Sequence, residues 1–414
     1  MTTLDLKQIQ ISSAIELFSK GEINQALDAV QDLFKDYPNE PLLFNIRGAC
    51  HAGLGQLDVA IKNYEEAIAI KPDYAKAHFN LASAFHDLGQ LEAAVKSYEK
   101  TLEIEPDYAE AHNNLGNVFK ELEQGDAAVQ SYKKALEVKP DYIEAQYSLG
   151  IMLQDLGQFE AAIKCYEMVL AIKPDFAGAY NISGVCYKAI GQLDVAIKSF
   201  EKALTLKPDY AEVYNNLGII HMQLEQLDAA VESYKKAIAI KPYFAEAHNN
   251  LGISLKELGQ LDDAVKSYKK TIAIKPDFAE AHNNLGNALK VLDRLDAAVK
   301  CYERTLNIKP NFAEAHNNLG NVFKDLGQLD DAVKSFKKAI ANKPDFTEAY
   351  YNHSISLMEL EQLDAAVESF EKALAIKPDY TEVNYNLGLT FQELGQLDAA
   401  IKSYERALAV KPDY

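Results

Sequence analysis

Prolines recur along this chain at an interval of 34 residues, from Pro38 to Pro412, and Pro41 is the only proline outside the series. Proline is poorly tolerated inside helices and central strands, so a strict proline period means that one structural unit ends at the same point each time. Twelve units of this length account for residues 7–414 and leave a leader, residues 1–6. The chain is therefore expected to fold as a tandem array of one small motif.

Each unit has the residue pattern of two helices joined by a tight turn. In the unit that begins at Ala245, apolar and small residues recur at steps of three and four over 248–255 and again over 261–272. Gly259 separates the two stretches, where it can take the left-handed conformation that ends a helix, and Pro276 ends the second stretch. In most units an Asp follows the proline and a Glu comes three residues later, which is the spacing of a capping box for the next helix.

Small residues occur where the two helices of a unit have to approach each other closely. With the units numbered so that the proline is position 32, position 8 is small throughout and position 20 is alanine in all twelve units. Position 24 is aromatic in eleven units. Gly252 is an example of position 8, Ala230 of position 20 and Tyr268 of position 24. We expect these three positions to form the packed contact between the helices of a pair.

These features resemble the tetratricopeptide repeat (TPR), a helix–turn–helix of 34 residues with a small residue, an alanine, an aromatic residue and a closing proline. The resemblance covers residues 7–414. It implies an all-α fold, a TPR α-solenoid in which about twelve repeats form a right-handed superhelix. First helices would then line a concave groove, and second helices would face outward. The chain departs from the family at position 4, where several units have histidine: His78, His112, His248, His282 and His316.

The repeats also define the expected domain organisation. Residues 1–40 are expected to comprise the leader and a degenerate capping repeat, because this unit has Val30 where the others have an aromatic residue. Residues 41–414 are expected to form eleven tandem repeats in one continuous solenoid domain, since a solenoid adds its core repeat by repeat.

Composition argues against several classes of partner and compartment. The net charge is −19, with 42 basic and 61 acidic residues, which disfavours nucleic acid or an anionic membrane as the main ligand. The N-terminus lacks the pattern of a signal peptide, and no apolar run has the length of a membrane span. The four cysteines are scattered without close pairs and are expected to be reduced core residues. A cytoplasmic location is therefore expected.

Position 6 carries the clearest functional pattern. It is asparagine in every unit from Asn216 onward, although asparagine is a poor residue for a helix interior. One carboxamide offers an acceptor and two donors, so a column of them can bind the main chain of an extended peptide whatever its side chains. The alternative is that each asparagine bonds to a neighbouring repeat. The column, with the string AEAHNNLGN at 109–117, 279–287 and 313–321, resembles the asparagine ladder in the TPR arm of O-linked N-acetylglucosamine transferases. That resemblance implies peptide contacts for what we call the asparagine row: Asn80, Asn114, Asn216, Asn250, Asn284, Asn318, Asn352 and Asn386.

Two further positions on the first helices have both a binding and a structural interpretation. Position 5 is aromatic in Phe79, Tyr147, Tyr351 and Tyr385, whose rings either form pockets for a ligand or pack against an adjacent helix. Position 12 is lysine in several units, which gives either a basic strip for an acidic peptide or cations placed for the helix dipole. The second interpretation is favoured because it explains each lysine locally. These lysines are Lys120, Lys188, Lys256, Lys290 and Lys324.

No constellation for catalysis, a cofactor or a metal is found in the sequence. It lacks a phosphate-binding glycine loop, a nucleophile elbow and an H-E-x-x-H motif. The histidines at position 4 occur once per repeat, too far apart to share a metal ion. We therefore expect no catalytic, cofactor-binding or metal-binding residues.

The last unit ends without a polar helix that would cover Leu397, Ile401 and Tyr404. Because solenoids generally need a capping element, we expect this face to associate with a partner or a second copy, or the natural protein to continue.

Two functions stay open. The favoured one is a protein–protein interaction scaffold, without chemistry of its own, that binds extended peptide segments. The alternative is the substrate-recruiting arm of a protein-modifying enzyme, an O-GlcNAc transferase-like glycosyltransferase or a sulfotransferase, whose catalytic domain lies outside these residues.

Overall fold

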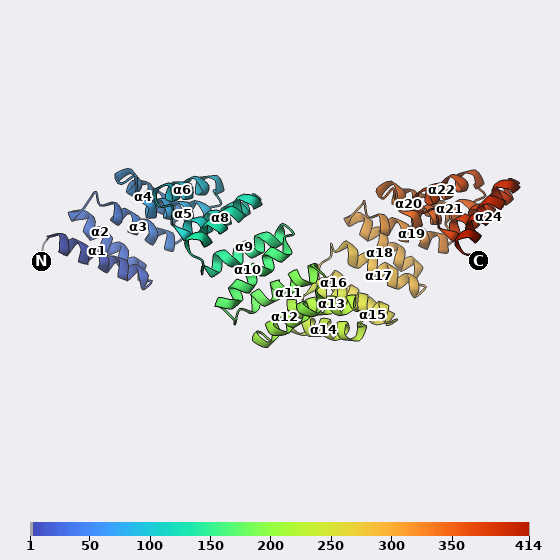
Figure 1. The fold of residues 1–414 in the computed structure, drawn as a ribbon, viewed down its shortest axis with the longest axis horizontal. Helices are drawn as coiled ribbons and strands as arrows, with labels where there is room; N and C mark the ends of the chain where they lie inside the picture. Colours follow the sequence, from blue (N-terminus) through green and yellow to red (C-terminus); the bar gives the residue numbers. More distant parts are fainter. Residues whose placement is uncertain (1–2, 414) are drawn as a thin grey trace. The chain divides into compact units, whose positions relative to one another are not determined.

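The computed structural model describes residues 3–413, and the regular structure in this range is helical throughout (Figure 1). The helices form pairs, one pair for each unit of the sequence repeat, which confirms the predicted all-α repeat fold. The first helices of the pairs are α1 (Thr3–Ser19), α3 (Pro41–Gly53), α5 (Ala75–Asp87), α7 (Ala109–Glu121), α9 (Ile143–Asp155), α11 (Ala177–Ala189), α13 (Ala211–Gln223), α15 (Ala245–Glu257), α17 (Ala279–Val291), α19 (Ala313–Asp325), α21 (Thr347–Glu359) and α23 (Thr381–Glu393). The second helices are α2 (Ile23–Asp36), α4 (Leu57–Ile70), α6 (Leu91–Ile104), α8 (Gly125–Val138), α10 (Phe159–Ile172), α12 (Leu193–Leu206), α14 (Leu227–Ile240), α16 (Leu261–Ile274), α18 (Leu295–Ile308), α20 (Leu329–Asn342), α22 (Leu363–Ile376) and α24 (Leu397–Val410).

The chain consists of two compact units. The first, Met1–Pro208, holds α1 to α12, and the second, Asp209–Tyr414, holds α13 to α24. The described part of the leader is continuous with the first helix, because α1 begins at Thr3. The expectation of one continuous solenoid domain over residues 41–414 stays a prediction.

Within each compact unit the helices follow one pattern of contacts. Each second helix packs against its own first helix and against the first helix of the next repeat, as α20 packs against α19 and α21. Consecutive first helices also contact each other directly, as α15 contacts α17. Consecutive second helices make no comparable contact in the described chain, so furrows lie between them, each with a first helix as its floor. We call these the outer furrows.

The predicted contact between the helices of a pair is confirmed. The Tyr268 side chain is fully buried, and a Cβ atom on Gly252 would lie 2.6 Å from its ring. Gly320 and the Phe336 ring approach each other equally closely, at 2.6 Å. Because the ring of the second helix occupies the space that a side chain at position 8 would fill, glycine there permits the close approach. The alanines at position 20 are buried in every unit.

The turn inside each helix pair requires a left-handed residue. Gly259 and Gly327 both have φ +74° there, which costs glycine little. Other units have a residue with a Cβ atom in the same conformation, including Glu123 with φ 58° and Glu361 with φ 60°. These turns are strained, because the left-handed region is unfavourable for such residues.

We therefore expect Glu361→Gly to stabilise its repeat. The substitution removes a left-handed strain of about 1–2 kcal/mol. Glycine loses more conformational entropy on folding, which offsets part of this gain, so the net increase in the free energy of unfolding is about 0.5–1 kcal/mol. Urea unfolding of the full chain measures the gain. Gly327→Ala, at an equivalent turn, is the matched control and should lose stability. Equal effects of the two substitutions would contradict this account of the turn.

The predicted capping boxes are wrong. Helix α17 begins at Ala279 with Phe278 as its N-cap residue, and no side-chain bond caps it. The Phe278 carbonyl accepts instead from the backbone N–H groups of Ala281 and His282, at 3.1 and 3.3 Å. The helix starts one residue too late for the Asp277 side chain to occupy the N-cap position.

The cysteines are core residues, as predicted. Cys50, Cys165 and Cys186 are buried and Cys301 is half-buried, and all four are free thiols. Burial raises the pKa of each of these thiols. They are therefore poor nucleophiles at neutral pH.

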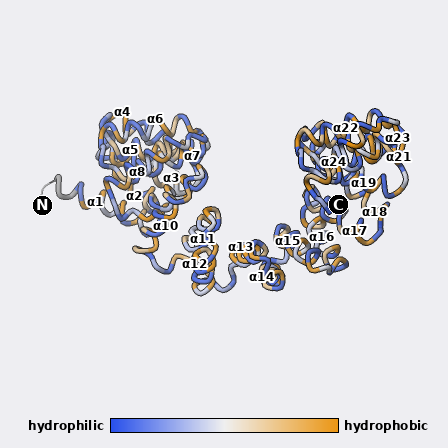
Figure 2. The backbone as a smooth tube through the Cα atoms, turned by 45° about the vertical axis from the view of Figure 1, so that its right-hand side comes forward, coloured by the Kyte–Doolittle hydropathy of each residue, from blue (hydrophilic) through white to orange (hydrophobic). Residues whose placement is uncertain are grey.

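Hydrophobic and hydrophilic residues are interspersed along the helices, as Figure 2 shows. None of the described helices combines the length and the hydrophobicity needed to cross a membrane. On α24, the Leu397 and Ile401 side chains are 62% and 54% exposed. Association through this face stays a prediction.

Candidate peptide-binding surface

The asparagine row lies on the first helices, and its side chains are half-buried except for that of Asn352, which is buried. Six of its members donate a side-chain N–H to the residue at position 5 of the preceding repeat. The donor–acceptor pairs are Asn80–Asn45 (2.9 Å), Asn250–Asn215 (3.2 Å), Asn284–Asn249 (3.2 Å), Asn318–Asn283 (3.1 Å), Asn352–Asn317 (3.1 Å) and Asn386–Tyr351 Oη (3.3 Å).

These bonds show that the asparagine row connects adjacent repeats, as the structural alternative proposed. The asparagine acceptors are buried, with Asn249 and Asn283 only 6% and 7% exposed, so their oxygen atoms depend on the donor from the next repeat. Sequence analysis found the position-6 residues and missed these partners. The signal was the doubled asparagine that occupies positions 5 and 6 of several units, since each unit can then accept from one neighbour and donate to the other.

The bond between repeats uses only part of each position-6 carboxamide. A carboxamide has two N–H groups and an oxygen that accepts, and the bond to position 5 takes one N–H. The side chains of Asn250, Asn284 and Asn318 have no second hydrogen-bond partner among residues 7–413. One N–H and the oxygen of each therefore have capacity for a ligand.

Other members of the row have less capacity. Asn386 donates both N–H groups, the second to the Glu382 carbonyl at 2.8 Å. Asn114 accepts from Asn113 at 3.3 Å and also bonds to Tyr98. The capacity for a ligand is therefore best preserved on α15, α17 and α19. Peptide contact by the row stays a prediction.

One link between repeats is missing on α7. The Asn113 oxygen is buried without a hydrogen-bond partner among the described residues. The donor should come from position 6 of the next repeat, but that residue is Ser148, whose side chain bonds to Tyr132. Where a serine interrupts the asparagine row, the chain therefore loses one hydrogen bond between repeats.

Ser148→Asn is expected to restore this link. The new carboxamide should donate to the Asn113 oxygen and raise the free energy of unfolding by about 1 kcal/mol, the usual net gain from one hydrogen bond. Thermal unfolding of the full chain measures the change, with Ser148→Ala as the control that offers no donor. An asparagine variant no more stable than the alanine variant would contradict the pairing.

The aromatic residues at position 5 pack inside their own repeats. The Phe79 ring stacks on the Tyr108 ring with 4.9 Å between centroids, and the Tyr147 ring lies 5.1 Å from the Phe176 ring, tilted by 37°. Tyr108 and Phe176 are the last residues of these repeats. The packing interpretation therefore accounts for these two rings without a ligand.

Two of the lysines at position 12 have acidic partners nearby. Lys256 lies 3.0 Å from Glu257, and Lys290 reaches Asp325 of the next repeat at 3.2 Å. Both pairs are partly exposed, so each contributes little to stability. These partners neutralise Lys256 and Lys290, which disfavours a basic strip for an acidic peptide at these two positions.

The histidines at position 4 have a structural role that the sequence analysis did not identify. The Nε2 atoms of His248 and His316 bond to the carbonyl oxygens of Pro242 and Pro310 at 3.1 and 2.9 Å. Burial lowers the pKa of both imidazoles. The recurring spacing of six residues between proline and histidine was the available signal. Residues 7–413 contain no group of histidine, cysteine and acidic side chains able to hold a metal ion.

Family models match most of the chain. A model described as TPR repeat matches residues 52–89, 82–123, 116–157, 184–225, 220–259, 254–293, 292–327 and 356–395. A model described as tetratricopeptide repeat matches residues 143–176, 313–346 and 382–414. Together they cover well over half of the chain.

Individual relatives match only in part. The peroxisomal targeting signal receptor of Saccharomyces cerevisiae is 28% identical over 82 residues, which are 20% of this chain and 13% of the receptor. The receptor of Candida glabrata is 31% identical over 74 residues, 18% of this chain and 12% of the receptor. Each match thus spans about an eighth of the receptor's length.

Similarity to several solved structures is also found. MamA is 29% identical, with 40% of this chain and 96% of MamA covered and a TM-score of 0.38. YrrB, described as a TPR protein with an unusual peptide-binding site, is 23% identical, with 44% and 95% covered and a TM-score of 0.39. The Cut9–Hcn1 hetero-tetramer of the APC/C is 12% identical, with 100% and 95% covered and a TM-score of 0.47.

Proposed function

This chain belongs to the tetratricopeptide repeat family, and from that premise we propose that it is a protein–protein interaction scaffold whose first helices bind an extended peptide segment. The proposed partner is a protein or peptide, and the location is the cytoplasm. The net charge of −19 supports a protein partner over nucleic acid or an anionic membrane. The matched models describe repeats alone, which supports a binding role over a catalytic one.

The observation that carries the proposal is the series of paired carboxamides on α15, α17 and α19. Asn250, Asn284 and Asn318 each keep one N–H and one oxygen after bonding to the preceding repeat. Main-chain groups of an extended peptide alternate donors and acceptors, so each carboxamide can bond to the peptide as both acceptor and donor. Such bonds do not depend on the side chains of the peptide.

The bonds between repeats also prepare these side chains for binding. A free asparagine side chain has to be ordered when a ligand binds, at a cost in conformational entropy. The bond from Asn284 to the buried Asn249 already fixes the orientation of the carboxamide. The structural role of the asparagine row therefore supports a binding role for the groups that remain.

A displayed library of random peptides, selected on the full chain, tests the proposal. The affinity of a selected peptide is then measured for Asn321→Arg, which places a long charged side chain on α19 next to Asn318 without removing a link between repeats. Lys235→Glu on the second helix α14 is the control. We expect at least a tenfold loss for the first variant and little change for the second, since the peptide should lie on first helices. Failure to select any peptide, or loss with the control variant alone, would contradict the proposal.

A further inference from the structure

The outer furrow between α20 and α22 contains a cavity that the proposed function does not use. Its volume is about 320 Å³, and its floor is α21. The polar side chains that line it come from all three helices: Lys337 on α20, Tyr350 and His353 on α21, and Glu368, Ser369 and Lys372 on α22. The cavity lies wholly within the second compact unit.

His353 is the unusual residue of this furrow. It occupies position 7, where most other repeats have a buried leucine such as Leu319 or Leu387. The imidazole is only 8% exposed, and its Nδ1 atom lies 3.0 Å from the Ser369 hydroxyl. Its Nε2 atom is buried without a hydrogen-bond partner among the described residues. A buried polar atom without a partner is costly, so this nitrogen indicates a group that is still to be added.

The other outer furrows do not share this feature. In the furrow between α18 and α20, the histidine is His316 at position 4, and its Nε2 atom is already bonded to Pro310. Among residues 7–413, His353 is the one histidine whose Nε2 atom is buried without a hydrogen-bond partner. The difference arises because Tyr350 holds position 4 in this repeat and the histidine lies one turn further along α21.

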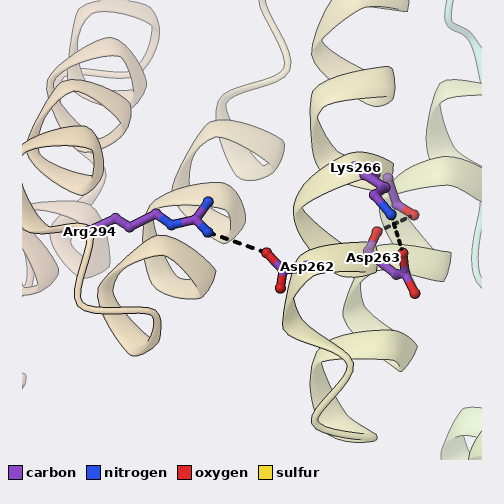
Figure 3. A network of polar contacts seen from close by, with 5 residues as sticks. Asp262, Asp263, Lys266 and Arg294 are labelled. Carbon is purple, nitrogen blue, oxygen red and sulfur yellow. Dashed lines mark hydrogen bonds and ion pairs between the residues drawn. The ribbon is translucent and has the colours of Figure 1, made fainter.

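Two lysines supply positive charge to the same cavity. Lys372 is paired with Glu368 at 2.7 Å, but no ion pair of Lys337 is found among residues 7–413. Basic residues at other positions of the second helices, by contrast, are neutralised locally. Figure 3 shows Lys266 paired with Asp263 on α16, and Arg294 reaching Asp262 from the start of α18.

The electrostatics of the cavity favour an anion. Burial, followed by the charges of Lys337 and Lys372, lowers the pKa of His353 to about 4. The imidazole is therefore neutral at pH 7, and one ring nitrogen carries a proton. The Ser369 hydroxyl donates its one proton to the Tyr350 carbonyl at 3.3 Å, so it accepts from the Nδ1–H group of His353, and the Nε2 atom of the neutral ring carries no proton.

We propose that this furrow binds a small oxyanion, a phosphate or a carboxylate, between His353 and Lys337. On binding, the His353 ring takes up a proton at Nε2 and donates it to one oxygen of the anion, and the ammonium group of Lys337 balances the charge. Lys372 contributes less, because Glu368 already neutralises it. The same chemistry fits a free anion and an acidic side chain of a bound protein, so the two sources are separated by experiment.

The test follows the His353 ring by NMR in the full chain while inorganic phosphate is added, with chloride at equal ionic strength as the reference. A bound anion stabilises the protonated imidazole, so phosphate is expected to raise the pKa of His353 beyond any effect of chloride. Hexaglutamate in a parallel titration represents an acidic peptide. A response to phosphate indicates a site for free anions, and a response to hexaglutamate alone indicates an acidic peptide. Absence of both responses would overturn the proposal.

Matched variants locate the site. Lys337→Ala should weaken the response at least about tenfold, as expected for loss of a charge-assisted contact. Lys235→Ala removes the lysine at the same position of α14, where the furrow has Leu251 at position 7, and should leave the response unchanged. His353→Leu introduces the residue that other repeats have, so it should fold, and phosphate binding by calorimetry should be lost. Equal effects of the two lysine variants, or full binding by the leucine variant, would also overturn the proposal.

Discussion

Replacing Phe336 with alanine is expected to lower the free energy of unfolding by about 3–5 kcal/mol, the range for a buried aromatic residue. The ring is fully buried between α19 and α20, where it fills the space opposite Gly320. A cavity left there cannot collapse easily, because both helices are held by the next repeat as well. Urea unfolding measures the total loss, and amide exchange measures the local loss in α19 and α20.

Phe336→Tyr is the matched control for this substitution. Tyrosine occupies the same position in the preceding repeat, where the Tyr302 hydroxyl donates to the Asn287 side chain at 2.7 Å. Asn321 holds the position of Asn287 in the repeat of Phe336, so the new hydroxyl has an acceptor available. The tyrosine variant should stay within about 1 kcal/mol of the natural chain. An alanine variant as stable as the tyrosine variant would refute the packing described for this position.

The second large effect is expected when Asn250, Asn284 and Asn318 are changed together to alanine. The oxygens of Asn215, Asn249 and Asn283 would each lose their donor while buried. An unsatisfied buried polar group costs about 1–3 kcal/mol, so the triple variant should lose about 3 kcal/mol or more of stability. Urea unfolding checks this value.

Changing both partners of one hydrogen bond between repeats distinguishes the loss of that bond from a general loss of stability. Asn284→Ala alone should be less stable than the double variant that also carries Asn249→Leu, because the double variant has no orphaned oxygen. A triple variant as stable as the natural chain would show that the links between repeats contribute nothing. The expected loss also means that peptide affinity of the triple variant is informative only where its helices remain folded.

The fold could be predicted from the sequence because every repeat gives the same signal. The prolines indicate the period, and Gly252, Tyr268 and the alanines at position 20 predict the contact between paired helices. The starts of the first helices were predicted less well. An Asp and a Glu three residues apart have the spacing of a capping box, but helix α17 begins after Phe278. The first turn is closed by the carbonyl of the half-buried Phe278, which accepts from Ala281 and His282, and no side chain caps it.

The candidate surface could be predicted only in part. A period in the sequence shows which residues share a face, and so it identified the asparagine row. It does not show which repeat a side chain contacts, so the bond from Asn284 to Asn249 was not foreseen. The orphaned atoms of Asn113 and His353 were also hidden, because each depends on the residue that a neighbouring helix places opposite it.

The most direct test of the proposed function is amide hydrogen exchange of the full chain with and without a peptide selected from a random library. The proposal predicts that the bound peptide slows exchange in α15, α17 and α19, the helices that carry Asn250, Asn284 and Asn318. Exchange in the second helices α14, α16 and α18 should change little. Protection confined to the second helices, or no protection at saturating peptide, would contradict peptide binding by the first helices.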